Sequence, residues 1–138
     1  VATASTLTLA ADTISVVNYT GAAACAATLP AATQGTVVIY CQSKDTTGGT
    51  ATLSFDCAGS DAYATGSVIE SRGSDEATFD TSAAGETLLT FTPVNAATNL
   101  LTVGGQIAFT CYEDGTWHIA SSLARETTQV KGAFVFAA

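Results

Sequence analysis

The chain has 138 residues, of which 47% are hydrophobic and only 12% are charged, and its formal net charge is −8. So little charge beside so much apolar side chain argues against disorder, and the length suits one domain with its own core. The acidic surface repels phosphate backbones and anionic lipids, and no apolar run is long enough to cross a bilayer, so we expect neither nucleic acid nor membrane as a partner.

The residue types favour β-structure. The apolar residues are largely Ala, Val and Leu, and the polar residues are mainly Thr, Ser and Gly. Thr and Val suit a pleated sheet, whereas the Lys, Glu, Gln and Arg that cover exposed helices are scarce. The sequence therefore predicts an all-β chain.

The first half of the chain alternates polar and apolar residues in short runs separated by turn residues. Gly21 and Pro30 end two of these runs, and a polar loop over residues 44–49 follows the strongest one. Because this loop ends in Gly48-Gly49, we expect a hairpin between the runs on either side of it. The predicted strands are residues 5–9, 14–19, 25–29, 36–42 and 50–56.

The second half continues the pattern with shorter strands. Glu113-Asp114-Gly115 lies between the runs 106–112 and 116–120 and predicts a tight hairpin. Residues 94–98 are ambiguous and could form a helical turn, and residues 123–127 are expected to be a connector. We predict further strands at residues 67–70, 77–79, 86–92, 99–103 and 130–136, with loops at 58–64 and 71–75.

This spacing of strands and turns is typical of two packed antiparallel sheets or of a small closed barrel. We find no linker and therefore expect residues 1–138 to form a single β-sandwich domain.

The four cysteines are too far apart for a CxxC metal or redox motif. Alternation along the strands places Cys41, Cys57 and Cys111 on the same faces as apolar neighbours, so we expect them to face the core. Buried apolar thiols are chemically inert. A disulfide between two cysteines, Cys25 included, remains an alternative.

The single histidine, His118, lies between Trp117 and Ile119, which share the opposite face of a predicted strand. We therefore expect Trp117 in the core and His118 outside it, without an acid or nucleophile to work with.

The acidic pairs Asp75-Glu76 and Glu113-Asp114 point to opposite faces if they lie on strands, so neither forms a catalytic dyad by itself. Solvated loop charge is the preferred interpretation, and a weak calcium site where loops meet is the alternative. No nucleotide-binding, hydrolase or zinc motif occurs. We thus predict no catalytic residue, no cofactor and no metal, and a chain that is not an enzyme.

Apolar residues are in excess at both ends of the chain. Phe134 and Phe136 share one face of the last predicted strand and Val135 takes the other, so both faces are apolar. A lone domain rarely exposes such a strand. We therefore expect an N-terminal arm (residues 1–12) and a C-terminal strand (residues 127–138) to make contacts between subunits. The candidate interface residues are Leu7, Leu9, Val130, Phe134, Val135 and Phe136.

Three segments carry a resemblance to a known group of proteins. They are TLPAATQG at residues 28–35 with the strand after it, GGTATL at 48–53, and residues 105–119 with their Asp-Gly turn and Trp117. This arrangement resembles a module of β-rich structural proteins of tailed phages, among them head decoration proteins and fibre or spike domains.

The resemblance implies a small, jelly-roll-like sandwich without catalytic residues. A decoration (cement) protein of this kind forms a homotrimer on the capsid surface and clamps neighbouring major capsid proteins, so the expected location is the virion. Two alternatives stay open at this point. One is a fibre, spike or receptor-binding domain, and the other is a pilin-like or surface-layer subunit.

Overall fold

The computed structural model describes residues 6–46, 51–72, 77–92, 101–125 and 134–138. Over these residues the protein consists of strands and turns without a helix, which confirms the all-β prediction. No membrane-spanning helix is therefore present in the described ranges. The strands are β1 (Thr6–Thr8), β2 (Thr13–Val17), β3 (Cys25–Thr28), β4 (Val37–Gln42), β5 (Leu53–Asp56), β6 (Ala62–Tyr63), β7 (Val68–Arg72), β8 (Ala77–Thr81), β9 (Leu88–Phe91), β10 (Gln106–Glu113), β11 (Thr116–Arg125) and β12 (Phe134–Ala137).

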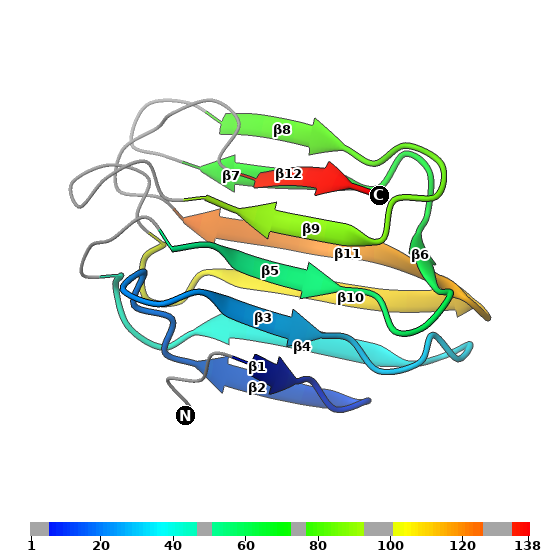
Figure 1. Cartoon of the computed structure of the whole chain (residues 1–138), viewed down its shortest axis with the longest axis horizontal. Coiled ribbons are helices and arrows are strands. Elements are labelled where there is room, and N and C mark those ends of the chain that lie inside the picture. Colours follow the sequence, from blue (N-terminus) through cyan, green and yellow to red (C-terminus); the bar gives the residue numbers. More distant parts are fainter. Residues whose placement is uncertain (1–5, 47–50, 73–76, 93–100, 126–133) are drawn as a thin grey trace.

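The strands form two sheets that lie face to face (Figure 1). One sheet has five strands in the order β1-β3-β5-β9-β12. The other has seven, in the order β2-β4-β10-β11-β7-β8, with β6 beside β11. The predicted sandwich is confirmed, and neither sheet closes into a barrel.

The first five strands alternate between the two sheets. β1, β3 and β5 lie side by side in the five-stranded sheet and run parallel, and β2 runs parallel to β4 in the other sheet. Each connection crosses from one layer to the other, so the chain winds around the core. The predicted hairpin between residues 36–42 and 50–56 is therefore wrong, because β4 and β5 belong to different sheets. These parallel pairs also separate the topology from a wholly antiparallel jelly roll.

The later strands are mostly antiparallel. β5, β9 and β12 alternate in direction, and β10 and β11 form the predicted hairpin. Gly115 has a φ of +82° at its turn, a conformation that glycine adopts without steric cost. β11 runs on to Arg125, where a connector was expected, and β6 lies in a segment expected to be loop. Residues 94–98 lie outside the described ranges.

Aromatic side chains fill the space between the sheets. Tyr40 from the seven-stranded sheet packs edge-to-face on Phe55 of the other sheet, with ring centroids 5.0 Å apart. Phe55 in turn contacts Phe109 at 5.3 Å. Trp117 is fully buried, as the sequence predicts. Rings that bridge two layers dominate the burial energy of a sandwich this small.

A buried amide holds the chain after β2 against β4. Gln42 is almost completely buried, and its Oε1 accepts a hydrogen bond of 2.6 Å from the Tyr40 hydroxyl. Its Nε2 donates to the carbonyl of Tyr19 at 2.7 Å and to that of Lys44 at 2.6 Å. Because every polar atom of this side chain has a partner, the network fixes the position of β2 at the end of its sheet.

Candidate functional site

His118 and Trp117 lie as the sequence predicts. Trp117 is in the core, and Ile119 packs against the core from the same face. His118 is half-buried on the opposite face, where its ring lies 4.9 Å from the ring of Tyr112. Within the described part of the chain, no cluster of three or more His, Cys, Asp or Glu side chains could hold a metal ion.

The described loop carboxylates bind backbone amides. Asp61 accepts a hydrogen bond of 2.7 Å from the amide of Ala32, and Asp114 accepts one of 2.8 Å from Gln34. The amide of Gly115 donates to the carbonyl of Ala32 at 2.8 Å. Two of the segments that carry the phage resemblance, residues 28–35 and 105–119, are thus bound to each other. Asp75-Glu76 lies outside the described residues.

All four cysteines are free thiols. Cys111 is buried and Cys57 packs against the core, as predicted, whereas Cys41 does not face it. β4 is apolar on both faces, and the face with Val38 and Tyr40 is the buried one, so Cys41 lies half-buried on the outer face of the sheet. Burial raises the pKa of the Cys57 thiol to about 12, with a smaller contribution from the charge of Asp61.

The interface candidates at the chain ends divide into two groups. Leu9, Phe134 and Phe136 are buried in the core of the chain itself, and Leu7 packs against that core. Among the described candidates, only Val135 is exposed, at 48%. Val130 lies outside the described residues. Intramolecular packing thus accounts for most of the apolar excess at the ends, and contacts between subunits have to be sought elsewhere on the surface.

The end of the sandwich formed by β8 and β12 is closed by a side chain. β12 is the outermost strand of the five-stranded sheet and β8 that of the seven-stranded sheet. Asp80 of β8 reaches across, and its carboxylate accepts a hydrogen bond of 2.8 Å from the amide of Phe136 in β12. A charged group directed at the edge is one of the ways in which proteins prevent further strand pairing.

The opposite end, formed by β1 and β2, lacks such protection in the described residues. β1 and β2 are the outermost strands of their sheets (Figure 1). Neither strand contains a charged residue or a proline. Two side chains of β2 are exposed although they are apolar, Ile14 at 64% and Val16 at 48%. We call β2 with these two side chains the open edge.

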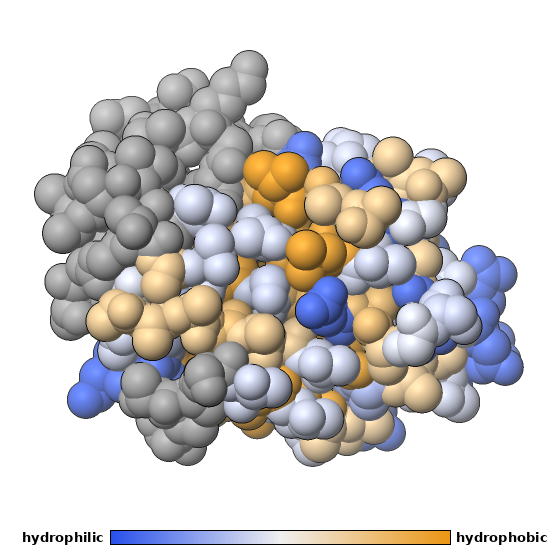
Figure 2. All heavy atoms as spheres, viewed as in Figure 1, coloured by the Kyte–Doolittle hydropathy of each residue, from blue (hydrophilic) through white to orange (hydrophobic). Residues whose placement is uncertain are grey.

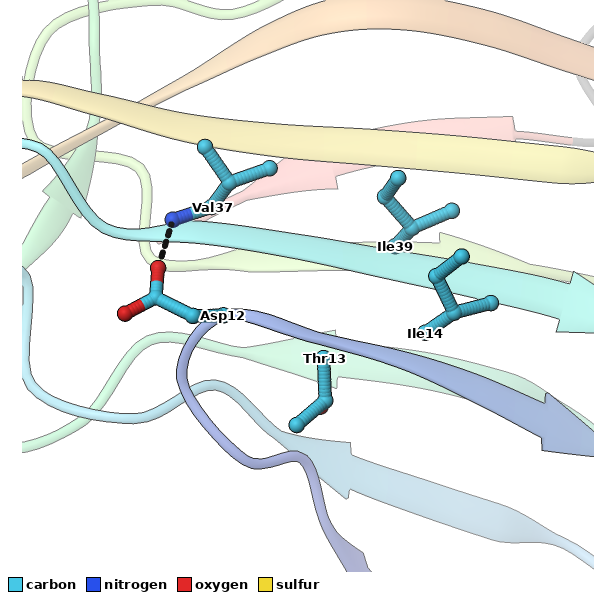
Figure 3. A pocket seen from close by; sticks show the side chains of 5 residues that line it. All are labelled: Asp12, Thr13, Ile14, Val37 and Ile39. Atoms are coloured by element: carbon cyan, nitrogen blue, oxygen red, sulfur yellow. Dashed lines mark hydrogen bonds between the residues drawn. The ribbon is translucent and has the colours of Figure 1, made fainter.

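An open hollow of about 220 Å³ lies beside the open edge, on the outer face of the seven-stranded sheet. Ile14, Val37 and Ile39 line it, together with Thr13 and Asp12 (Figure 3). The Asp12 carboxylate turns to the amide of Val37, from which it accepts a hydrogen bond of 3.1 Å. Since its charged group is occupied in this way, the hollow is mainly apolar and suits an aliphatic side chain.

The two outer faces of the sandwich differ in polarity. Strand register places Ile14 beside Ile39 and Ala108, and Val16 beside Cys41, on the outer face of the seven-stranded sheet. The row through Val16 and Cys41 continues to the exposed Gln106, so the apolar part of this face covers β2 and β4. The outer face of the five-stranded sheet is mixed, with pale residues interspersed with orange, hydrophobic ones (Figure 2). Its corresponding rows hold Thr6, Ala26, Ser54, Thr90 and Val135. The apolar outer face is therefore continuous with the open edge.

Sequence reasoning overlooked Ile14 and Val16. The alternation Ile14-Ser15-Val16 suggests that these residues face the core, but Thr13, Ser15 and Val17 take the core side, as their pairing with Val38, Tyr40 and Gln42 shows. The sequence does contain one signal for an unprotected edge strand: residues 13–17 include no Lys, Glu or Pro.

Comparison with known proteins adds no family to this picture. No family model, no curated protein and no solved structure matches the chain.

Proposed function

We propose that this chain is a non-enzymatic structural protein of a virion, of the capsid decoration type, that binds and stabilises the outer surface of a phage capsid. The observation that carries the proposal is the apolar surface over β2 and β4 on the outer face of the seven-stranded sheet, with Ile14, Val16 and Ile39, in a chain of net charge −8. Contiguous exposed apolar surface on a small domain marks a place that a partner covers.

The remaining surface suits a protein displayed on a particle. The outer face of the five-stranded sheet carries mainly Thr, Ser and Ala in its described rows, together with Asp56, Leu88 and Val135. One face for contact and one face for solvent is the arrangement that a decoration protein requires. The expected partners are the major capsid protein and further copies of this chain.

The contact between residues 28–35 and 105–119 also supports the proposal that this chain is a phage structural protein. The resemblance to phage structural modules rests partly on these segments, and backbone bonds such as Gly35 N–H to the Cys111 carbonyl, 2.9 Å, join them. Residues that are separate in the sequence therefore act as one structural unit. Fibre and spike domains are expected to share this unit, so it favours the phage class and not one role within it.

Binding to expanded phage capsids tests the proposal directly. Wild-type protein should sediment with capsids and raise the temperature at which they release DNA. Ile39→Lys places a charge on the apolar outer face and should weaken binding at least tenfold. Thr90→Lys, at a half-buried position on the opposite outer face, is the matched control and should bind like wild type. Wild-type protein that ignores capsids would refute the decoration role.

One observation favours a receptor-binding domain as a second candidate. Tyr112 is 59% exposed and its ring lies 4.9 Å from His118 at the tip of the β10–β11 hairpin. An exposed aromatic ring can stack on a sugar. A glycan array would show binding that Tyr112→Ala removes, and an array without signal would leave the decoration role in place.

A further inference from the structure

We propose that the open edge is a self-association site, at which β2 pairs antiparallel with β2 of a second copy of this chain. The inference deepens the proposed function, since it names the contact through which copies of a decoration protein join. It rests on three properties of β2: the direction of its backbone groups, the complementarity of its side chains with themselves, and its lack of charge.

Backbone groups of β2 are directed outward at Ile14 and Val16. The amide of Ser43 donates to the carbonyl of Val17 at 2.8 Å, so Val17 directs its carbonyl toward β4. Alternate residues of a parallel strand direct both backbone groups to the same side. Thr13, Ser15 and Val17 therefore pair with β4, and Ile14 and Val16 present their N–H and C=O groups to whatever lies beyond the edge.

The side chains of β2 complement themselves about Ser15. When Ser15 of one copy lies opposite Ser15 of the other, Ile14 lies opposite Val16 of the second copy, and Val16 opposite Ile14. Both pairs are apolar, both are on the outer face, and the same two residues supply the outward hydrogen bonds. A two-fold contact needs a patch that fits itself, and this register provides one.

Charge selects this edge as the place where two copies approach each other. Each copy carries a net charge of −8, which opposes association over most of the surface. Residues 13–17 carry no charge, and the nearest carboxylate, Asp12, is bound to the amide of Val37. Charge repulsion between two copies is thus low at β2, where the backbone groups of Ile14 and Val16 are directed outward.

The second layer of the sandwich adds to the contact. β1 is the outermost strand of the five-stranded sheet at the same end as β2 (Figure 1). A two-fold axis perpendicular to the sheets that pairs β2 with its copy also brings β1 toward β1 of that copy. β1 carries only Thr6, Leu7 and Thr8 and is likewise uncharged. Both sheets would then continue across the axis, and the assembly would contain an even number of chains in place of the homotrimer that the resemblance implies.

Disulfide trapping tests the register. Ile14→Cys and Val16→Cys are made separately in a Cys41→Ala background, because Cys41 is next to Val16. Opposed residues of an antiparallel pair have Cα atoms about 5.5 Å apart, within the range of a disulfide. An oxidised mixture of the two variants should give a cross-linked dimer, and each variant alone should give little. Equal cross-linking of all three samples, or none, would overturn the register.

Native mass tests the contact itself. Val16→Lys introduces a charge at the open edge, and Val135→Lys is the control, since both valines are 48% exposed and lie on outermost strands. Wild type and Val135→Lys should contain an even number of chains, and the dissociation constant of Val16→Lys should rise at least tenfold. Val16→Pro, which removes an outward N–H and no bond to β4, should act in the same way.

These outcomes separate the inference from the function. A wild-type monomer, a trimer, or a dimer that survives both substitutions at Val16 would refute the pairing, whether or not the protein binds capsids. A dimer with the predicted cross-link that ignores capsids would refute the decoration role and leave the pairing established.

Discussion

The two ends of the sandwich differ in how the unpaired backbone groups of their outermost strands are protected. At the end formed by β8 and β12, the carboxylate of Asp80 binds the amide of Phe136, so an outward backbone donor is already occupied. At the end formed by β1 and β2, Ile14 and Val16 combine exposed apolar side chains with outward backbone groups. Exposed strand edges invite pairing, and the described residues at this end lack the usual protection, which is consistent with the proposed pairing of β2.

The difference follows from how the chain is wound. Connections that cross between the layers stack β1, β3 and β5 in parallel and β2 beside β4, and this stacking stops at β1 and β2, which no other described strand covers. The later strands pair mostly antiparallel, and β8 and β12 come close enough for a side chain of one sheet to reach the other. The parallel winding thus ends on an open edge, and the antiparallel strands end on a closed one.

Truncation of an apolar residue in each outermost strand should give the largest contrast between the ends. Phe136 is buried with its ring 5.2 Å from that of Tyr63, so Phe136→Ala should lower the free energy of unfolding by about 3–5 kcal/mol. Ile14 is 64% exposed, so Ile14→Ala should change it by less than about 0.5 kcal/mol. Urea unfolding measures both.

Both truncations belong in the Val16→Lys background, where self-association does not contribute to stability. A large loss at Ile14 in that background would mean that the open edge is covered within one chain, and the contrast between the ends would disappear.

The sequence predicts the parts of the fold that depend on neighbours along the chain. The β10–β11 hairpin follows from its Asp-Gly turn, and alternation within one strand buries Trp117 and places the half-buried His118 on the opposite face. The prediction of which face is buried fails where a strand is apolar on both faces. β4 offers Val37, Ile39 and Cys41 on one side and Val38 and Tyr40 on the other, so parity alone does not say which side is buried.

The candidate site is harder to predict for the same reason. Ile14 and Val16 look like core residues until the pairing of β2 with β4 is known. Likewise, the loop between β4 and β5 reads as a hairpin, whereas packing of β5 beside β3 places it in the other layer. Such choices depend on contacts between residues that are distant in the sequence, which local patterns do not encode.

Removal of the closing contact should cost less than removal of a core ring. Asp80→Ala leaves the amide of Phe136 without its charged acceptor and should lower the free energy of unfolding by about 1.5–2 kcal/mol. Asp80→Asn keeps an oxygen acceptor and should cost less than half of that. Hydrogen exchange of the Phe136 amide should accelerate in Asp80→Ala only. Unchanged exchange would show that Asp80 does not close this end.

At the open end, Asp12 should matter less. It has a φ of 55°, and its carboxylate accepts a hydrogen bond from the amide of Val37 at the start of β4. Asp12→Ala loses this exposed bond and places alanine in the left-handed region, and the two effects together should cost about 1.5 kcal/mol. Asp12→Asn keeps an acceptor and tolerates that conformation, so its stability should match wild type. Thermal unfolding of both variants checks the difference.

The smallest expected effect on stability is that of the Cys57 thiol. This residue packs against the core between the two ends and belongs to neither of them. Its pKa is about 12 in the folded chain against 9.0 for an ordinary thiol, mainly because of burial. The unfolded chain then releases this proton first, so the stabilisation is complete below pH 9 and is lost as the pH rises toward 12. At pH 10 the loss should be less than about 1 kcal/mol, because solvent partly reaches the thiol. Cys57→Ala should flatten the decline of stability between pH 9 and 10, which urea unfolding at each pH would record. An equally steep decline in the variant would assign the alkaline sensitivity to the buried tyrosines, whose pKa values are also raised by burial.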